Sequence, residues 1–412
     1  MNILLLTNGI PYPPDSGPRV KTYQLIRYLA TRHSVTLVSL GHDARELERA
    51  AALAPFCAAV HIVPATSSPW RSLRGAFGPL PRSVSRHESE ALRALLARLV
   101  AEAAARGAPF DLVHADQLAM APYAEALPLP RLLDAHNALW TIKAREAEGR
   151  RWPLSLPARL EAARLRAYEG RVCAGFDAVT AVSEEDRAAL LAAGPARELT
   201  VIPIGIDGDA LAPVRRAPEA RAVLSLAAPG WPPNAEGIAW FAREVYPLVR
   251  RAVPDSHLYI CGAQPAPELR ALAEATPAID VTGFVNPGPF LEQAAALIAP
   301  LRSSGGMRVM LPEALARGVP VVATSLACAG LDVVPGEHLL VADTPSAFAD
   351  AVALLLRDHD LGERIGAAAR RHALDRYDWR ATCPAIDGVY ARITATGAPR
   401  SDETQAPATA PL

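Results

Sequence analysis

The chain opens with NILLLTNGIPYPPDSGPRVKTYQLIRYLATRHSVTLVSL, residues 2–40, and this stretch predicts the fold. The continuous apolar run Asn2–Thr7 ends at Asn8-Gly9, as expected of a strand that is buried on both faces of a parallel sheet. Apolar residues then recur at helical spacing over residues 20–31, and Val35–Leu40 predicts a second strand. A strand, a loop, a helix and a strand in this order indicate a doubly wound α/β domain.

The same alternation continues outward from this stretch along most of the chain. Further strands are predicted at residues 61–63, 111–114, 131–133, 178–182 and 200–202, with a helix at 90–105. The alternation pauses in an Ala-, Pro- and Arg-rich stretch that ends near residue 219, and then resumes. The second series of strands is predicted at residues 223–226, 257–261, 279–281, 297–299 and 320–322, with helices capped by Asn234 and at 268–275, 307–316, 346–356 and 361–374.

This pattern predicts two Rossmann-like, doubly wound α/β domains that face a central cleft. We expect the first domain to cover residues 1–207 and the second to cover residues 208–376, because the alternation pauses between them. Open α/β sheets bind ligands at the carboxyl ends of their strands, so a small-molecule site is expected in the cleft. Residues 396–412 are rich in Pro, Thr and Ala without an apolar period, and we expect them to be disordered.

Composition excludes several classes of protein. Hydrophobic residues make up 50% of the 412 residues and charged residues 21%, which rules out a disordered chain. The 42 basic and 43 acidic residues leave a net charge of −1, so no nucleic-acid partner is expected. No apolar run is long enough for a membrane span, and Met1–Leu6 lacks the basic segment of a secretory signal. The five cysteines are scattered, which favours a reducing, cytoplasmic location and no zinc site.

The segment most informative about chemistry is PLRSSGGMRVMLPEAL, residues 300–315. A strand ends here, two glycines follow, and a helix begins. Amide groups at such a helix start bind phosphate oxygens together with the helix dipole, and glycines let the backbone approach the ligand. Arg308 would add a charge-assisted contact, and Glu313 would accept hydrogen bonds from a ribose diol. The alternative is a tight strand-to-helix turn followed by a solvated glutamate.

The residues from Gly305 to Thr324, GGMRVMLPEALARGVPVVAT, resemble the donor-site signature of family GT4 glycosyltransferases, which have the GT-B fold. Other segments are similar to further parts of the same family. They are GWPPNAEG at 230–237, LYICG at 258–262, VTGFV at 281–285, YDW at 377–379 and the loop PYPPDSG at 11–17. The resemblance covers most of the chain. It implies that the final helix, residues 379–393, packs back onto the first domain.

The resemblance implies transfer of a sugar from a nucleotide diphosphate sugar with retention of anomeric configuration, without a metal or another cofactor. It further implies a bacterial enzyme of cell-surface polysaccharide or glycolipid synthesis, with a saccharide or lipid-linked acceptor. The departing nucleotide gains negative charge, which the site must stabilise. The expected catalytic-site residues are His136, Asp116 and Gly17. The expected donor-binding residues are Gly230, Asn234, Gly262, Gly283, Phe284, Gly305, Gly306, Met307, Arg308 and Glu313.

Two departures from the family pattern leave alternatives open. Met310 stands where the family usually has a phosphate-binding lysine, and Ala329 stands where an acidic residue often precedes Gly-Leu. Loss of an ammonium contact to a diphosphate would cost about 1.5–3 kcal/mol of leaving-group stabilisation. The first alternative is therefore a nucleotide-sugar-binding protein with weakened transfer. The second is a GT-B sugar-nucleotide 2-epimerase, which needs an acid/base cluster in the cleft that the sequence does not show around His136 and Asp116.

Two further polar segments have structural interpretations. Asp207-Gly208-Asp209 has the spacing of a metal-binding D-x-D motif, but it lies in the interdomain stretch and predicts a turn. Residues 143–171 contain eight basic residues against four glutamates, and they include Lys143, which with Lys21 makes up all the lysine of the chain. This stretch is either a solvated helical face or a contact with an anionic bilayer. The second interpretation would place the protein at the inner face of the cell membrane.

Overall fold

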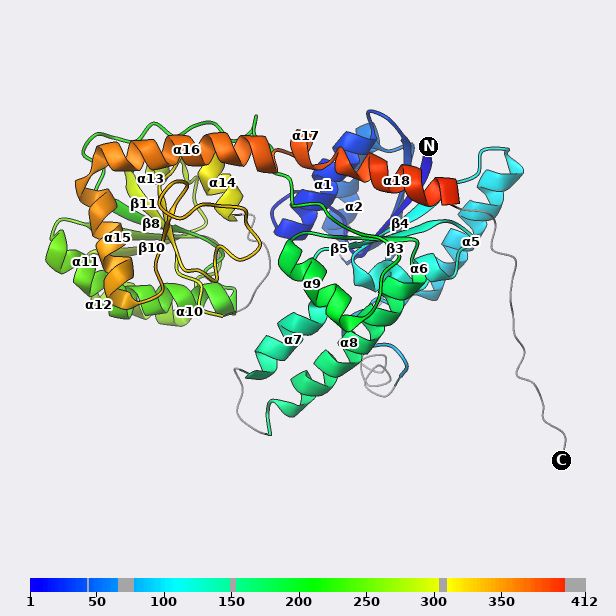
Figure 1. Ribbon diagram of the computed structural model, residues 1–412, viewed down its shortest axis with the longest axis horizontal. Coiled ribbons are helices and arrows are strands. Elements are labelled where there is room, and N and C mark those ends of the chain that lie inside the picture. Colours follow the sequence, from blue (N-terminus) through cyan, green and yellow to red (C-terminus); the bar gives the residue numbers. More distant parts are fainter. Residues whose placement is uncertain (43, 66–77, 149–152, 304–309, 397–412) are drawn as a thin grey trace.

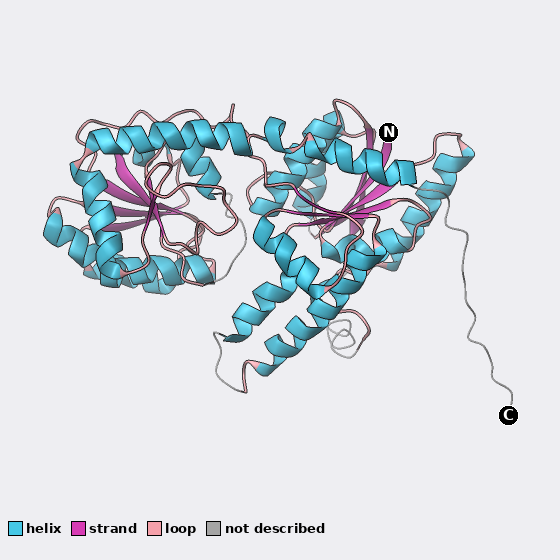
Figure 2. Cartoon of the chain, in the orientation of Figure 1, coloured by secondary structure: helices cyan, strands magenta, loops and turns pink. Residues whose placement is uncertain are grey.

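The computed structural model describes residues 1–42, 44–65, 78–148, 153–303 and 310–396. It has two lobes, and each contains one sheet with helices packed on both faces (Figures 1 and 2). All strand pairings within the described residues are parallel. These observations confirm the predicted α/β class with two doubly wound units.

The N-terminal lobe contains a seven-stranded sheet in the order β3-β2-β1-β4-β5-β6-β7. Its strands are β1 (Asn2–Thr7), β2 (Ser34–Gly41), β3 (Ala59–Pro64), β4 (Leu112–Asp116), β5 (Arg131–Ala135), β6 (Ala178–Ala181) and β7 (Leu199–Val201). The central strands β1 and β4 are buried almost throughout, which explains their continuous apolar sequences. The strand order changes direction between them, and such a point opens a crevice at the carboxyl edge of the sheet.

The C-terminal lobe contains a six-stranded sheet in the order β10-β9-β8-β11-β12-β13. Its strands are β8 (Ala222–Leu226), β9 (His257–Cys261), β10 (Ile279–Gly283), β11 (Ala294–Ala299), β12 (Val321–Ala323) and β13 (Leu340–Val341). The order changes direction between β8 and β11, so this sheet also has a crevice at its carboxyl edge. Every strand that the sequence predicts is present in one of the two sheets.

Helices connect the strands and cover the sheets. In the N-terminal lobe they are α1 (Gly17–Leu29), α2 (Ala44–Ala50), α4 (Arg82–Ser85), α5 (Glu90–Ala105), α6 (Ala121–Glu125), α7 (Leu139–Glu148), α8 (Leu156–Gly175) and α9 (Glu184–Ala193). In the C-terminal lobe they are α10 (Pro232–Trp240), α11 (Tyr246–Ala252), α12 (Pro267–Ala275), α13 (Gly288–Gln293), α14 (Met310–Ala316), α15 (Pro345–Arg357) and α16 (His359–Tyr377). The chain then forms α17 (Trp379–Thr382) and α18 (Ala385–Thr396) on the N-terminal lobe.

Two helix predictions were wrong in how the helix begins or continues. The helix that Asn234 was expected to cap begins at Pro232 instead, because proline needs no backbone donor in a first helical turn. The Asn234 amide donates to the carbonyl of Ala228, 3.2 Å away. The single final helix predicted at 379–393 is two helices, α17 and α18, and Pro384 lies between them. From residue 397 onward, the predicted disordered tail lies outside the described residues.

The chain crosses between the lobes twice, and the two crossings lie side by side. The amide of Ile206 donates to the carbonyl of Tyr377 at 2.7 Å, and the amide of Trp379 donates to the carbonyl of Ile206 at 2.9 Å. A Cβ at Gly205 would lie 2.7 Å from the Cα of Trp379, so this close approach requires glycine. The crossings therefore form a short hydrogen-bonded ribbon between the lobes.

The last helix, α18, packs on the sheet of the N-terminal lobe. Val389, Tyr390 and Ile393 are buried against a cluster that includes Ile3 and Leu5 of β1. In the part of the chain that the structure describes, no helix combines the length and the apolar character needed to cross a bilayer.

Candidate functional site

A cavity of about 720 Å³ lies between the lobes, at the carboxyl ends of their strands. One wall is formed by residues 14–18, which are the end of the loop before α1 and the first two residues of that helix, together with His136 and Asn137, which follow β5. The opposite wall comes from the loops after β8, β9 and β10 and from helix α14. Sheets of this kind bind small molecules at this edge, so the cavity is the candidate functional site.

The cavity brings together many of the residues that the sequence singled out. The predicted site residues in its wall are Gly17, His136, Asn234, Gly262, Phe284 and Glu313. Asp116 lies behind His136, whereas Gly230 and Gly283 belong to the same loops as lining residues without lining the cavity. The predicted phosphate-binding residues Gly305, Gly306, Met307 and Arg308 lie outside the described residues.

Gly262 explains how the two loops of the C-terminal wall approach each other. Its φ angle is +153°, and a Cβ here would lie 2.1 Å from the carbonyl oxygen of Ala227. Only glycine fits such a contact, which brings the loop after β9 directly against the loop after β8. The backbone of both loops can then form this part of the cavity wall, and a ligand can approach that backbone closely.

Glu313 is the acidic side chain of the C-terminal wall. It lies in the first turn of α14, near a helix end that favours negative charge. Burial raises the pKa of Glu313 above its usual range, and the charge of Arg317 opposes this shift. A half-buried carboxylate that faces the cavity is suited to accept hydrogen bonds from a diol.

Met310 also lines the cavity, at the start of α14. Its thioether carries no charge and is at best a weak acceptor. The guanidinium of Arg302 stacks on Trp240, with its central carbon 4.8 Å from the ring centroid. Among the described lining residues, Arg317 is the one cation.

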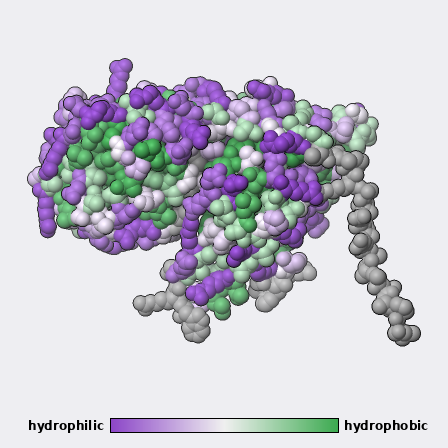
Figure 3. Space-filling model, in the orientation of Figure 1, coloured by the Kyte–Doolittle hydropathy of each residue, from purple (hydrophilic) through white to green (hydrophobic). Residues whose placement is uncertain are grey.

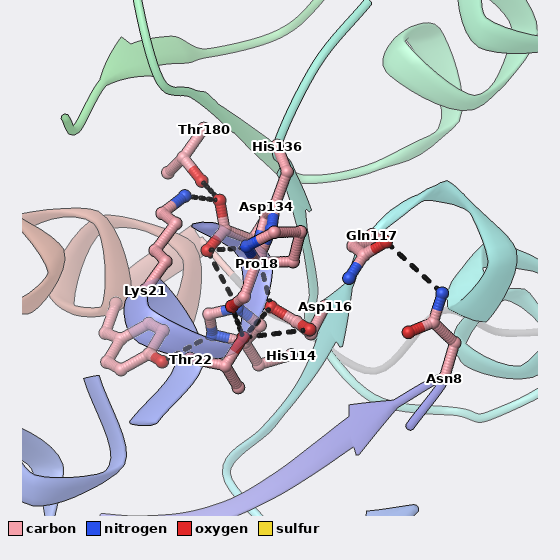
Figure 4. A network of polar contacts seen from close by, with 11 residues as sticks. Asn8, Pro18, Lys21, Thr22, His114, Asp116, Gln117, Asp134, His136 and Thr180 are labelled. Carbon is pink, nitrogen blue, oxygen red and sulfur yellow. Dashed lines mark hydrogen bonds and ion pairs between the residues drawn. The ribbon is translucent and has the colours of Figure 1, made fainter. Parts of the chain in front are cut away.

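On the N-terminal wall, the ring of His136 is held by a carboxylate. Its Nε2 atom lies 2.8 Å from Oδ1 of Asp116, and the whole residue is only 5% exposed. Its Nδ1 atom is buried and has no hydrogen-bond partner among the described residues. Asp116 also accepts from the hydroxyl of Thr22, which is 3.1 Å from both carboxylate oxygens (Figure 4). The imidazole therefore has one firmly fixed orientation.

A second carboxylate, Asp134, lies beside the first one and pairs with a lysine. The ammonium of Lys21, in α1, contacts Oδ1 of Asp134, and the hydroxyl of Thr180 donates to the same oxygen at 2.7 Å. Burial alone would raise the pKa of Asp134, but the Lys21 charge and the imidazole of His114, whose Nε2 lies 3.6 Å from Oδ2, hold it well below its usual range. Asp134 is therefore an ionised carboxylate in the interior.

Sequence reasoning missed these buried neighbours of His136 and Asp116, although His136 is the one member of the described cluster that lines the cavity. Lys21, His114 and Asp134 lie at the same edge of the sheet, because α1 crosses the ends of β4 and β5 (Figure 4). Ligand atoms of His114, Asp116 and Asp134 lie within 4.8 Å of one another, a spacing that would suit a metal ion. Lys21 already supplies a positive charge to Asp134, which disfavours a second cation there.

The Asp207-Gly208-Asp209 segment forms the predicted turn. The amide of Ala210 donates to the carbonyl of Asp207 at 3.1 Å. The carboxylate of Asp207 pairs with Arg27, and that of Asp209 pairs with Arg380. Both carboxylates therefore join the interlobe crossing to the helices beside it.

Two family models match the chain, one for each lobe. Residues 16–210 match the model described as Glycosyltransferase Family 4. Residues 221–358 match the model described as Glycosyl transferases group 1.

Relatives and solved structures agree with these matches. The chain is 30% identical over 287 residues to a GDP-mannose-dependent alpha-(1-6)-phosphatidylinositol monomannoside mannosyltransferase of Mycobacterium tuberculosis, which covers 63% of this chain and 71% of the relative. It is 32% identical over 162 residues to a phosphatidyl-myo-inositol mannosyltransferase of Mycobacterium leprae, covering 37% of this chain and 42% of that relative. The structure of a sucrose-phosphate synthase from Thermosynechococcus elongatus superposes with a TM-score of 0.72 at 16% identity, over 96% of this chain and 100% of that one.

Proposed function

The chain belongs to glycosyltransferase family 4 and has the GT-B fold, and on this basis we propose that it transfers a sugar from a nucleotide diphosphate sugar to an acceptor hydroxyl with retention of anomeric configuration. The observation that carries the proposal is the interlobe cavity with Glu313 on one wall and Gly17 and His136 on the other. A donor between the two walls would have its nucleotide against the C-terminal lobe and its sugar against the N-terminal lobe.

The C-terminal wall supports the placement of the donor. Glu313 would accept from the ribose diol, and Phe284, which is 88% exposed at the rim, would flank the base. The start of α14 would direct its amides and the positive end of its dipole at the diphosphate. Gly305, Gly306, Met307 and Arg308 belong to this proposal by their sequence alone. Gly230, Gly262 and Gly283 have no side chains, so the backbone of their loops could approach the base closely.

The N-terminal wall supports the placement of the transferred sugar. Gly17 and the loop before it line the cavity opposite the C-terminal loops, and His136 lies beside them with Asp116 behind it. The departing diphosphate would gain charge at the C-terminal wall, where Arg317 is a lining cation. This chemistry assigns no role to a metal ion.

We propose a glycolipid as the acceptor, in bacterial cell-surface synthesis. Two relatives are named for mannosyl transfer to phosphatidylinositol compounds. The chain covers 42% of the length of the Mycobacterium leprae relative, which is less than two thirds. GDP-mannose is therefore the first donor to test. A saccharide acceptor is the second possibility, and the acceptor assay distinguishes the two.

A peripheral contact with the inner face of the cell membrane would bring such an acceptor to the cavity. Helices α7 and α8 form a hairpin that extends from the N-terminal lobe (Figure 1), and α7 begins two residues after the cavity residue Asn137. Near the free end of the hairpin, Leu154, Leu156 and Leu160 are 72%, 48% and 57% exposed. Figure 3 shows hydrophobic surface toward this end of the hairpin. Exposed leucines on a hairpin with basic flanks are suited to an anionic bilayer surface.

Two observations favour other functions specifically. Met310 in the cavity wall favours a nucleotide-sugar-binding protein with weak transfer, since no ammonium stands at that position. The cluster of Asp116, Asp134 and His136 would supply groups for a 2-epimerase, but both carboxylates are only 2% exposed. Proton transfer to a bound sugar would then depend on His136 alone, which is why transfer is the favoured function.

The experiment is a thermal-shift panel of UDP-, GDP-, ADP- and TDP-sugars on the purified chain, followed by turnover with an acceptor. A sugar nucleotide at 100 times its dissociation constant should stabilise the fold by about 2.7 kcal/mol. The absence of any shift across the panel would contradict the proposal. Isomerisation of the donor sugar without an acceptor would support the epimerase, and binding without turnover would support the weakened protein.

A further inference from the structure

Two consecutive residues of α1, Lys21 and Thr22, contact two carboxylates in the last two positions of neighbouring strands, Asp116 at the end of β4 and Asp134 one residue before the end of β5. Lys21 pairs with Asp134, and both side chains are buried, with 6% and 2% of their surface exposed. Thr22 lies 3.1 Å from both oxygens of Asp116, which in turn holds Nε2 of His136 at 2.8 Å (Figure 4). One turn of helix is thus connected to both acidic groups beside His136.

The same turn of helix is also connected to the cavity loop. Helix α1 begins at Gly17, and residues 14–18 line the cavity. The hydroxyl of Thr22 lies 2.9 Å from the carbonyl oxygen of Pro18 as well as near Asp116. The start of α1, the two carboxylates and His136 are therefore one continuous set of polar contacts.

We propose that Lys21 and Thr22 are positioning residues, which fix the distance and orientation between the loop around Gly17 and His136. The inference rests on the proposed transferase function, in which those two elements contact the transferred sugar. Lys21 anchors α1 to the end of β5, and Thr22 anchors it to the end of β4. Neither residue lines the described wall of the cavity, so they act through the groups that do.

The contacts of Lys21 and Thr22 matter because the N-terminal wall is built from two separate elements whose relative position must be fixed. The N-terminal wall combines a helix start with a strand end, and these elements are far apart in sequence. A displacement of about 1 Å between groups that contact the reacting sugar lowers turnover by as much as about a hundredfold. A buried ion pair and a shared hydroxyl restrict such a displacement, because any sliding of α1 would expose an unpaired charge to the interior.

The use of lysine at position 21 supports a specific role. The chain contains 42 basic residues, and Lys21 and Lys143 alone among them are lysines. Lys143 pairs with Glu146 three residues away on the surface, with about a third of each side chain exposed. Lys21 instead reaches across 113 residues of sequence to Asp134 in the interior. Lys143 therefore provides a matched control for Lys21.

The test compares variants by steady-state turnover and by donor binding. Thr22→Val removes the hydroxyl and keeps the shape, and Thr22→Ser restores the hydroxyl. Thr31→Val is the control, because the Thr31 hydroxyl donates to the carbonyl of Tyr28 at 2.8 Å and contacts no carboxylate in the described structure. We expect Thr22→Val to lower kcat by about tenfold to a hundredfold, with the donor dissociation constant changed less than about twofold. Thr22→Ser should recover most of the loss.

Lys21 needs a design that protects the fold, because Lys21→Met alone leaves Asp134 buried without its counter-charge. The double variant Lys21→Met with Asp134→Asn removes both charges and keeps an acceptor for Thr180. We expect it to fold, to bind the donor as the parent does, and to lose kcat to a similar extent as Thr22→Val. Lys143→Met should match the parent in donor binding and in kcat with an acceptor that is not held in a bilayer.

The outcomes separate this inference from the proposed function. If the parent chain binds and turns over a donor but Thr22→Val and the double variant keep the parental kcat, the inference is overturned and the function stands. A loss of thermal stability with unchanged kcat also overturns it, since that is the signature of a purely structural contact. A parent chain that neither binds nor turns over any sugar nucleotide overturns both.

Discussion

The phenol oxygen of Tyr390 lies 2.7 Å from Nδ1 of His114, although 276 residues of sequence separate them. Both side chains are fully buried, and their rings meet edge to face with centroids 6.0 Å apart. Burial raises the pKa of Tyr390 well above its usual range, so the phenol is neutral. The contact joins the last helix of the chain to the central strand β4.

Tyr390→Phe should destabilise the N-terminal lobe. The substitution keeps the ring but leaves a buried imidazole nitrogen without its partner, which costs about 1–3 kcal/mol. Denaturant unfolding measures the difference. Tyr259→Phe, at a half-buried tyrosine that packs on Phe290 in the other lobe, is the control. An unfolding free energy equal to that of the parent would contradict the role given to this hydrogen bond.

Glu169 should make stability fall as the pH rises. It is 1% exposed in α8 and accepts from the amides of Leu139 and Trp140 at the start of α7, at 2.8 and 3.0 Å. Burial raises its pKa from 4.5 to about 7, and these two amides oppose the shift. Because the folded-state pKa lies above the unfolded one, its contribution to stability is complete below pH 4.5 and is lost as the pH rises through about 7.

The pKa shift of Glu169 sets the size of this change in the unfolding free energy. It amounts to about 3 kcal/mol between low pH, where Glu169 is protonated in both states, and high pH, where it is ionised in both. The measurement is the unfolding free energy of the parent and of Glu169→Gln at pH 5 and pH 8.5. We expect the unfolding free energy of the parent to fall relative to that of Glu169→Gln when the pH is raised from 5 to 8.5. Glu161→Gln in the same helix, at a more exposed residue, is the control. A difference that stays constant with pH would show that Glu169 ionises normally.

Glu313→Gln should weaken binding of the sugar nucleotide. Loss of a charged acceptor for the ribose diol is expected to cost about 1.5–3 kcal/mol, which is about tenfold to a hundredfold in dissociation constant. Burial raises the pKa of Glu313, so the parent should lose donor affinity as the pH falls through that raised value. Calorimetric titration across pH measures both effects. Glu337→Gln, at an exposed glutamate, should bind as the parent does, and unchanged binding by Glu313→Gln would rule out the donor placement.

Met310→Lys should raise turnover. An ammonium at the start of α14 would oppose the negative charge that develops on the departing diphosphate, an effect of about 1.5–3 kcal/mol or at least about tenfold in kcat. The assay follows transfer and donor hydrolysis together. Met310→Leu keeps the shape without the charge and should leave both rates unchanged. If Met310→Lys gains nothing, the neutral residue is not what limits the chemistry.

Removal of the exposed leucines should weaken adsorption to anionic vesicles. Leu154, Leu156 and Leu160 each expose about half or more of their surface, and their transfer into the bilayer interface is favourable. The triple change to Ser should lower the bound fraction in a sedimentation assay by at least about tenfold in partition coefficient. Serine at Leu191 and Leu354, which are exposed elsewhere on the molecule, is the control. Equal adsorption by both variants would assign the contact to another surface.

The strands were predictable because parallel strands buried on both faces are continuous apolar runs. Asn2–Thr7 and His257–Cys261 have the predicted bounds for this reason. Several helices begin one to three residues before the predicted start. Pro18 and Pro345 lie in the first turns of α1 and α15, where proline is favoured. Because these prolines do not belong to the apolar pattern of the helix, the pattern places the helix start too late.

The candidate site was predictable only in part. His136 and Asp116 were expected together because they follow or end neighbouring strands, and they are hydrogen bonded. Lys21 was not expected there, because its place depends on how α1 crosses the sheet, and no local pattern records that. The roles of Gly305, Gly306, Met307 and Arg308 stay predictions, since these residues lie outside the described residues.

The paired crossings at Ile206 and Trp379 connect the lobes by two backbone segments that are hydrogen bonded to each other. A single proteolytic nick in one crossing would leave the other intact. The nicked protein should then migrate as one particle on a native gel and separate into two fragments only after denaturation.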